Sequence, residues 1–202
     1  AAANSVHMKV NWLRQGDFQV ELIDFVNRKD RVLDMGAMDV NATHIGFFAD
    51  DIQEHYDRIE SGGIWFRSKV NYWTPQTATV YGKDPDGNWF QLMTPYSGDT
   101  MPRAILPLAE NGIGHSHYGI IVNSMDAALP FYRDLMGMDV VKHTERKPDP
   151  TDERSQGTHL EGISLTEIWV RKGNFIIELV DFLNKKDDRV DMGATDVHAT
   201  HS

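Results

Sequence analysis

Cysteine is absent from this chain of 202 residues, and the absence narrows its chemistry. Without thiols there is no disulfide framework and no thiolate metal site, so a bound metal would need His, Asp, Glu or Gln ligands. Apolar runs are short, and none reaches the roughly 20 residues that span a bilayer. Basic residues are few, with 20 Lys and Arg against 30 Asp and Glu, a net charge of −10. This balance argues against nucleic-acid and anionic-membrane partners, which both reward basic surface.

What remains is an ordinary globular composition, with 41% hydrophobic and 25% charged residues. The length suits one large or two small domains with a sizeable core. Together these features favour a cytoplasmic protein. Residues 1–7, which precede Met8, are expected to be an expression scar and are excluded from the fold.

The chain repeats itself out of phase, because residues 11–44 reappear at 168–201 without a gap. Across this pairing 20 of 34 positions are identical. The matched residues include three pairs with chemically distinctive side chains: Trp12 and Trp169, Glu21 and Glu178, and His44 and His201. The chain thus begins partway through one repeating unit and ends partway through a later one. Such a repeat must be recognised before the fold is assigned.

Apolar periodicity predicts two β-α-β-β-β units and parts of two more. Strands are expected at 8–14, 17–25, 44–49, 64–69, 77–82, 88–94, 117–122, 138–143, 163–171 and 174–182, and helices at 51–61 and 124–136. Asp51 and Ser124 are the expected N-caps, and Pro130 predicts a kink or a late start in the second helix. The polar stretch 144–161 is expected to be a mobile loop beside the site.

These elements divide the chain into segments with different expected roles. The expected segments are a scar at 1–7, the last strands of a module plus a connector at 8–41, a full module at 42–98, a linker at 99–112, a second full module at 113–184, and a connector plus the first strand of a further module at 185–202. The strands left over at 8–25 and 197–202 carry unpaired edges that need cover. We therefore expect a homodimer or larger assembly.

Three stretches resemble one family. HYGIIVNSMDAALPFYRDLMGM at 117–138 and HIGFFADDIQEHYDRIESGG at 44–63 resemble the opening strand and helix of a vicinal oxygen chelate module, and KDPDGNWFQLMTPY at 83–96 resembles its closing hairpin. That superfamily includes glyoxalase I, methylmalonyl-CoA epimerase, extradiol dioxygenases, and fosfomycin- and bleomycin-resistance proteins. The resemblance implies an α+β fold in which paired βαβββ modules form an incomplete eight-stranded barrel around one divalent metal.

The resemblance also implies a ligand set, because the family places its ligands on the first and last strand of each module. The corresponding residues are His44, Gln91, His117 and Glu178, and the metal would be Zn, Ni, Co, Mn or Fe. Gln91 departs from the family, which most often has Glu there, and leaves the site one charge more positive. Glu21 and His201 are duplicates that could replace Glu178 and His44 in an exchanged or second site.

The residues themselves support part of this reading. Gln91 and Glu178 each lie inside an apolar run, and a carboxylate is rarely buried without a compensating partner such as a metal. The alternative is that Glu178 faces solvent and that the two histidines are structural. His115 lies two residues before His117 and is expected on the same face. Other histidines and tryptophans are expected to have structural or surface roles: His55, His143, His159, Trp12 and Trp169.

Three functions remain open at this stage. The first is a metal-dependent isomerase, epimerase or lyase, similar to glyoxalase or methylmalonyl-CoA epimerase, that stabilises an enolate of a small-molecule substrate, with Glu178 as ligand and catalytic proton carrier. The second is an extradiol-type dioxygenase that uses His44, His117 and Glu178, although the sequence offers no clear His-Tyr pair for its proton transfers. The third is a non-enzymatic binding or resistance protein. Metal content would distinguish the first two from the third.

Overall fold

The computed structural model describes residues 7–16, 18–27, 36, 39–95, 108–147 and 162–184. Its strands are β1 (Met8–Gln15), β2 (Phe18–Phe25), β3 (Thr43–Ala49), β4 (Trp65–Phe66), β5 (Asn71–Thr74), β6 (Thr77–Lys83), β7 (Trp89–Met93), β8 (Ile113–Ile121), β9 (Asp139–Arg146), β10 (Leu165–Lys172) and β11 (Phe175–Phe182). Its helices are α1 (Ile52–Ser61), α2 (Met125–Pro130) and a π-helical turn η1 (Phe131–Leu135). None of the helices in these described parts is long and apolar enough to cross a membrane.

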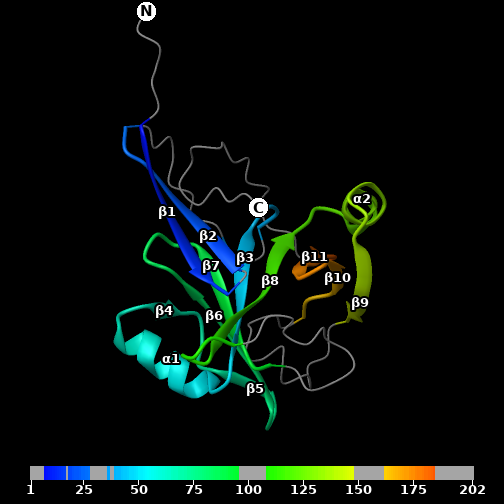
Figure 1. The fold of residues 1–202 in the computed structure, drawn as a ribbon. Coiled ribbons are helices and arrows are strands. Elements are labelled where there is room, and N and C mark those ends of the chain that lie inside the picture. Colours follow the sequence, from blue (N-terminus) through cyan, green and yellow to red (C-terminus); the bar gives the residue numbers. More distant parts are fainter. Residues whose placement is uncertain are drawn as a thin grey trace, which may run out of the picture.

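One strongly curved sheet dominates the molecule (Figure 1). Its strands run in the order β4-β6-β7-β3-β8-β11-β10-β9, and β5 pairs with β6. The two βαβββ modules meet where β3 pairs antiparallel with β8, while within each module the first and last strands pair in parallel, β3 with β7 and β8 with β11. The predicted α+β fold with an incomplete barrel of paired modules is confirmed.

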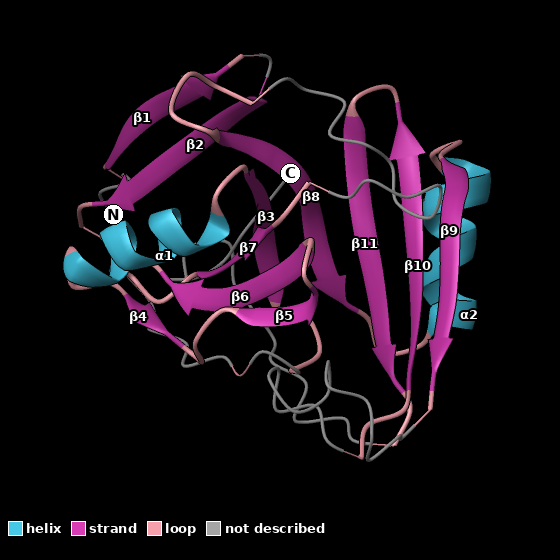
Figure 2. Ribbon diagram, turned by 90° about the horizontal axis from the view of Figure 1, so that it is seen from below, coloured by secondary structure: helices cyan, strands magenta, loops and turns pink. Residues whose placement is uncertain are grey.

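Each module packs its helix on the convex face of its half of the sheet (Figure 2). Helix α1 begins at the predicted N-cap, because the Asp51 side chain accepts a hydrogen bond from the Glu54 amide. It then packs Ile52 and Tyr56 against strand residues such as Leu92. Helix α2 begins at Ser124, as expected, and becomes π-helical directly after Pro130. Proline lacks an amide hydrogen, so a change of hydrogen-bond pattern at this position is expected.

The concave face carries a polar centre between two apolar clusters. One cluster consists of Phe48, Met93, Trp169 and Ile176. The other consists of Ala42, Ile121, Ile163, Leu165, Val180 and Phe182. Since side chains alternate between the faces of a strand, the residues between these clusters on β3, β7, β8 and β11 face the interior together.

Several boundaries differ from the sequence-based expectation, and strand β8 begins at Ile113 rather than at 117. The strand expected at 64–69 is reduced to β4, and β5 forms an additional short strand instead. Strand β9 continues to Arg146, so the start of the expected loop 144–161 is paired with β10. Its remaining residues, 148–161, lie outside the described parts of the chain, as do most of the connectors.

The hairpin of β1 and β2 forms a separate two-stranded sheet that reproduces β10 and β11 residue for residue. Trp12 pairs with Glu21 in the first hairpin, and Trp169 pairs with Glu178 in the second. Their surroundings differ, because Trp12 is 63% exposed whereas Trp169 is 3% exposed. The predicted repeat is therefore structural as well as sequential, but only the second copy lies inside the curved sheet.

Candidate metal centre

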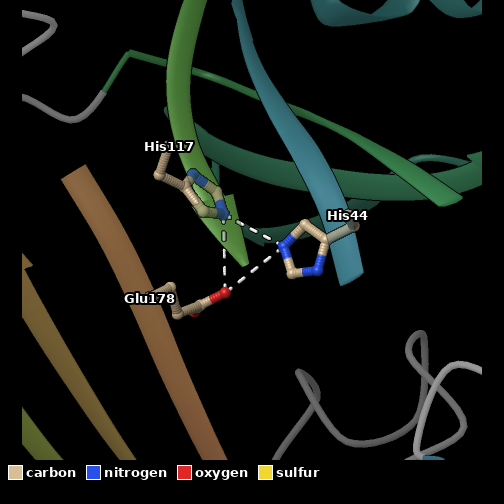
Figure 3. Close-up of side chains that lie close together, drawn as sticks. All are labelled: His44, His117 and Glu178. Carbon is tan, nitrogen blue, oxygen red and sulfur yellow. Dashed lines mark hydrogen bonds and ion pairs between the residues drawn. The ribbon is translucent and has the colours of Figure 1, made fainter. Parts of the chain in front are cut away.

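Three side chains from three strands converge on the concave face (Figure 3). His44 Nε2 lies 3.0 Å from His117 Nε2, and Glu178 Oε2 lies 3.3 Å from the first nitrogen and 3.4 Å from the second. All three residues are buried, with His117 fully inaccessible. Ligand atoms that share one tetrahedral zinc ion at 2.0–2.1 Å lie about 3.3–3.4 Å apart, so this spacing fits a metal centre.

Strand register brings the three donors together. In the antiparallel pairing of β3 with β8, His44 stands opposite Gly119 and His117 stands opposite Gly46. Each imidazole lies over the glycine across from it, and a Cβ on Gly46 or Gly119 would come within about 2 Å of a ring atom. The parallel pairing of β11 with β8 then places Glu178 beside Gly119. The glycines thus make the room in which the two rings meet.

Burial and hydrogen bonding set the charge states of the centre. Burial alone would raise the pKa of Glu178, but hydrogen bonds with His117 and His44 lower that pKa more strongly, so the carboxylate is ionised at neutral pH. Burial lowers the pKa of His117 by more than the neighbouring carboxylate raises it. A neutral imidazole beside an ionised carboxylate is the state in which both groups bind a cation.

A bulge in β8 positions the ring of His117. The pairing shifts so that Gly46 faces His117 while Phe47 faces His115, which leaves Ser116 as the extra residue. Ser116 Oγ lies 2.9 Å from His117 Nδ1 and 3.5 Å from the sulfur of Met93. When Nε2 is the ligand atom, Nδ1 carries the hydrogen and donates a hydrogen bond to Ser116 Oγ. This hydrogen bond fixes the orientation of the ring.

Gln91 lies at the position on β7 that corresponds to Glu178 on β11. It stands beside Gly46 in the parallel pairing of β3 with β7, as Glu178 stands beside Gly119. Its Nε2 donates to Thr79 Oγ1 at 2.8 Å and to the Tyr81 hydroxyl at 2.9 Å. Its Oε1 is buried and has no hydrogen-bond partner in the described parts of the chain.

The orphaned Gln91 oxygen is a second indication of a cation. A buried acceptor without a partner costs about 1–3 kcal/mol, and coordination of a metal would satisfy it. Two imidazoles, one carboxylate and one amide oxygen form a donor set that suits Zn, Ni, Co, Mn or Fe(II). The sequence-predicted residues His44, Gln91, His117 and Glu178 are therefore placed on one face of the sheet, and three of them form a group that could hold a metal ion.

The other candidates lie apart from this centre. The bulge turns His115 to the face opposite His117, contrary to the expectation that the two share a face, and its ring stacks on Phe18 of the separate hairpin at 3.8 Å. Burial lowers the pKa of His115 to about 4. His55 is buried on α1 and contacts Asp50. His143 is exposed, and His159 and His201 lie outside the described residues.

Sequence reasoning missed the partners of the ligands. Tyr81, Thr79 and Ser116 each contact a candidate ligand, and Trp169 packs against the His117 ring at 4.6 Å. A signal for Tyr81 was present, because the Asp-Pro-Asp-Gly turn pairs the strands on either side of it and sets Tyr81 opposite Gln91. No pattern in the sequence marks the bulge that selects Ser116.

Comparisons with known proteins found a matching family model and similar proteins. The family model described as the Glyoxalase/Bleomycin resistance protein/Dioxygenase superfamily matches residues 3–92 and 114–201. Glyoxalase I of Saccharomyces cerevisiae is 27% identical over 104 residues, which cover 52% of this chain and 30% of that protein.

Two solved structures of glyoxalase I from Zea mays share the fold. One has a TM-score of 0.50 at 16% identity, and a mutant form has a TM-score of 0.53 at 17% identity. Each alignment covers 84% of this chain and 51% of the maize chain. This chain thus spans about half of the length of the maize proteins and 30% of the yeast protein, and the solved structures establish a common fold alone.

Proposed function

Because the chain belongs to the Glyoxalase/Bleomycin resistance protein/Dioxygenase superfamily, we propose that it is a metal-dependent isomerase, epimerase or lyase that acts on a small molecule. The observation that carries the proposal is the set of three buried donor atoms, 3.0–3.4 Å apart, from His44, His117 and Glu178. The orphaned Oε1 of Gln91 supports a fourth ligand.

A divalent ion bound here would act as a Lewis acid toward two neighbouring oxygens of a substrate and so stabilise an enolate. The residues of the chain supply the remaining functions. His44 and His117 are neutral ligands, and the apolar clusters on both sides exclude water from the centre. Glu178 is ionised, and its carboxylate would accept a proton from substrate carbon, then return it to the neighbouring carbon in an isomerisation or to the same carbon in an epimerisation.

The proposal is tested by metal content and turnover on the same protein. Protein purified without chelator is analysed for metal, and metal-free protein is titrated with Zn, Ni, Co and Mn. Isomerisation of the methylglyoxal–glutathione adduct and epimerisation of methylmalonyl-CoA are then assayed with each metal. Stoichiometric binding with either turnover supports the proposal, and no metal binding under any of these conditions would refute it.

A second candidate is an extradiol-type dioxygenase. Two histidines and one carboxylate form the ligand set typical of non-haem Fe(II) oxygenases. This reading uses the compact group of His44, His117 and Glu178 as its ligands, without Gln91. Anaerobic loading with Fe(II), followed by catechol and oxygen, distinguishes the two, because ring cleavage requires the dioxygenase. Metal-free ligand capture without turnover would instead indicate a binding or resistance protein.

The amide at position 91 gives a direct test of the fourth ligand. Gln91→Glu is expected to be tolerated by the fold and to tighten zinc binding, because it places a second negative charge beside the cation. The variant keeps an oxygen at the position of Oε1 and loses the two hydrogen bonds that the amide nitrogen donates to Thr79 and Tyr81. Zinc affinity is measured by competition with a chromogenic chelator. An affinity lower than that of the wild type would remove Gln91 from the ligand set.

We further propose that the chain assembles into a homodimer or larger oligomer through the hairpin of β1 and β2. Its outward residues include large apolar side chains: Met8, Val10, Trp12, Leu13 and Leu22. Apolar surface of this kind on an unpaired strand pair favours association. Light scattering of the full chain should give at least twice the monomer mass, and deletion of residues 1–25 should reduce it. A monomer that is unchanged by the deletion would contradict this.

A further inference from the structure

Two rows of side chains cross the concave face, one in each module, and they correspond position by position. The first row holds Arg67, Tyr81, Gln91, Gly46 and His117. The second row holds Lys142, Trp169, Glu178, Gly119 and His44. Each row runs from a cation at the outer end, through an aromatic ring and a candidate ligand, to a glycine covered by a histidine of the other module.

The rows are built by strand pairing. Tyr81 pairs with Gln91 across β6 and β7, and the β4–β6 pairing continues to Arg67, whose amide donates to the Tyr81 carbonyl at 2.9 Å. Lys142 pairs with Trp169, which pairs with Glu178. Cross-strand partners lie on the same face of a sheet, so both cations belong to the concave face.

The two halves differ in their acids. Glu178 of the second row corresponds to the neutral Gln91 of the first. Glu167, two residues before Trp169 on β10, corresponds to Thr79, two residues before Tyr81 on β6. Neither of these positions in the first module therefore holds a carboxylate. The side of the metal centre formed by β6 and β7 is therefore more positive than the side formed by β10 and β11.

The two cations consequently have different partners. Lys142 donates to Glu167 at 2.8 Å, and the indole nitrogen of Trp169 donates to the same carboxylate at 2.6 Å. The guanidinium of Arg67 is half-buried and has no hydrogen bond or ion pair with another residue in the described ranges. The chain has a net charge of −10, so acidic side chains are plentiful. A half-buried arginine on the concave face without an acidic partner among the described residues indicates that its partner is an anion bound from solution.

We propose that Arg67 binds an oxyanion of the substrate, a carboxylate or a phosphate, on the β6–β7 side of the centre. A guanidinium binds either group through two parallel hydrogen bonds, which fixes orientation as well as position. The inference rests on the proposed function for its reacting end, since the anchored group would hold the substrate's vicinal oxygens against His44, His117 and Glu178. It specifies the substrate as an anion.

Arg146 provides a second contact for the same group. Arg146 follows Lys142 by four residues on β9, and an even spacing puts both side chains on the concave face. The Nε of Arg146 is buried and has no hydrogen-bond partner among the described residues. The positive charges of Arg146 and Arg67 both act on the Tyr81 phenol, against the burial and the carboxylates that raise the pKa of that group. Both arginines are thus close enough to act on Tyr81, which lies beside the candidate ligand Gln91.

The test uses succinate, its neutral analogue succinamide, and inorganic phosphate as probes of the metal-free full chain by calorimetry. Succinate or phosphate should bind and succinamide should not, and Arg67→Gln should weaken anion binding by about 10- to 100-fold. The tighter of the two anions identifies the group as carboxylate or phosphate. Arg133→Gln is the matched control, because Arg133 is exposed on η1 and paired with Asp134.

Zinc affinity separates this inference from the proposed function. Arg67→Gln should leave zinc binding unchanged, whereas loss of Glu178 should weaken zinc binding and leave the anion site intact. Anion binding that depends on Arg67 in a protein that binds none of Zn, Ni, Co and Mn would refute the metal-dependent function and keep the anion site. Equal binding of succinate by wild type and Arg67→Gln, or equal binding of succinamide and succinate, would overturn the anion site. If Arg67→Gln does not fold, Arg67→Lys takes its place and should also bind more weakly, because lysine lacks the planar fork.

Discussion

Replacement of Glu178 by glutamine is expected to weaken zinc binding by about 100-fold or more and to abolish isomerase turnover. The other candidate ligands, His44, His117 and Gln91, are neutral, so the variant removes the negative charge on which cation binding most depends. Glutamine has nearly the same volume and can still accept hydrogen bonds from the imidazoles. The fold should therefore survive, which circular dichroism and thermal unfolding would verify before zinc is titrated.

The chain contains its own control for this experiment. Glu21 lies in the duplicate hairpin opposite Trp12, in the register that Glu178 shares with Trp169. Glu21→Gln should change neither zinc affinity nor turnover, because β1 and β2 lie outside the curved sheet that builds the centre. A loss of zinc binding in Glu21→Gln, with none in Glu178→Gln, would assign the centre to the other copy of the repeat.

Gly119→Ala is expected to have the largest effect on stability of any single methyl group added to the centre. A Cβ at this position would lie 2.0 Å from a carbon of the His44 ring, far inside van der Waals contact. The ring must move or the two modules must separate where β3 pairs with β8. Overpacking of this kind costs about 1–3 kcal/mol of unfolding free energy, and displacement of His44 should also remove zinc binding.

A double-mutant cycle identifies the cause. In a His44→Ala background the space over Gly119 is open, so the further change Gly119→Ala should cost little. The coupling energy is obtained from the urea unfolding of the wild type, the two single variants and the double variant. Additive effects would show that the glycine is needed for its backbone rather than for the imidazole that covers it.

The repeat and the module boundaries made the fold predictable from sequence. Alternation of apolar residues along β6, β7, β10 and β11 gave the strands, and the capping residues Asp51 and Ser124 gave the helix starts. The candidate ligands followed from the family resemblance, which places them on the first and last strand of each module. Apart from the repeat, the strand and helix signals are local, because each depends on residues within a few positions of one another.

The features that escaped prediction depend on contacts between modules. The bulge at Ser116 reverses the face of His115, and a reading by strict alternation cannot anticipate an inserted residue. Gly46 and Gly119 are unremarkable in their own strands, and their role appears only when β3 pairs with β8. The charge difference between the β6–β7 side and the β10–β11 side likewise becomes visible only when the register of both strand pairs is known, because that register shows that Thr79 corresponds to Glu167.

The two hairpins also pose a problem of competition during folding. Strand β8 accepts the edge of β11, yet β2 carries a closely similar sequence that becomes available earlier along the chain. At two positions that are buried in the second copy the first copy is polar, because Asn11 and Gln19 stand where the second copy has Ile168 and Ile176. Docking the wrong hairpin would bury these amides without partners, at about 1–3 kcal/mol each. Asn11 and Gln19 thus help to determine which hairpin enters the curved sheet. They favour correct assembly of the metal centre although they are not among its candidate ligands.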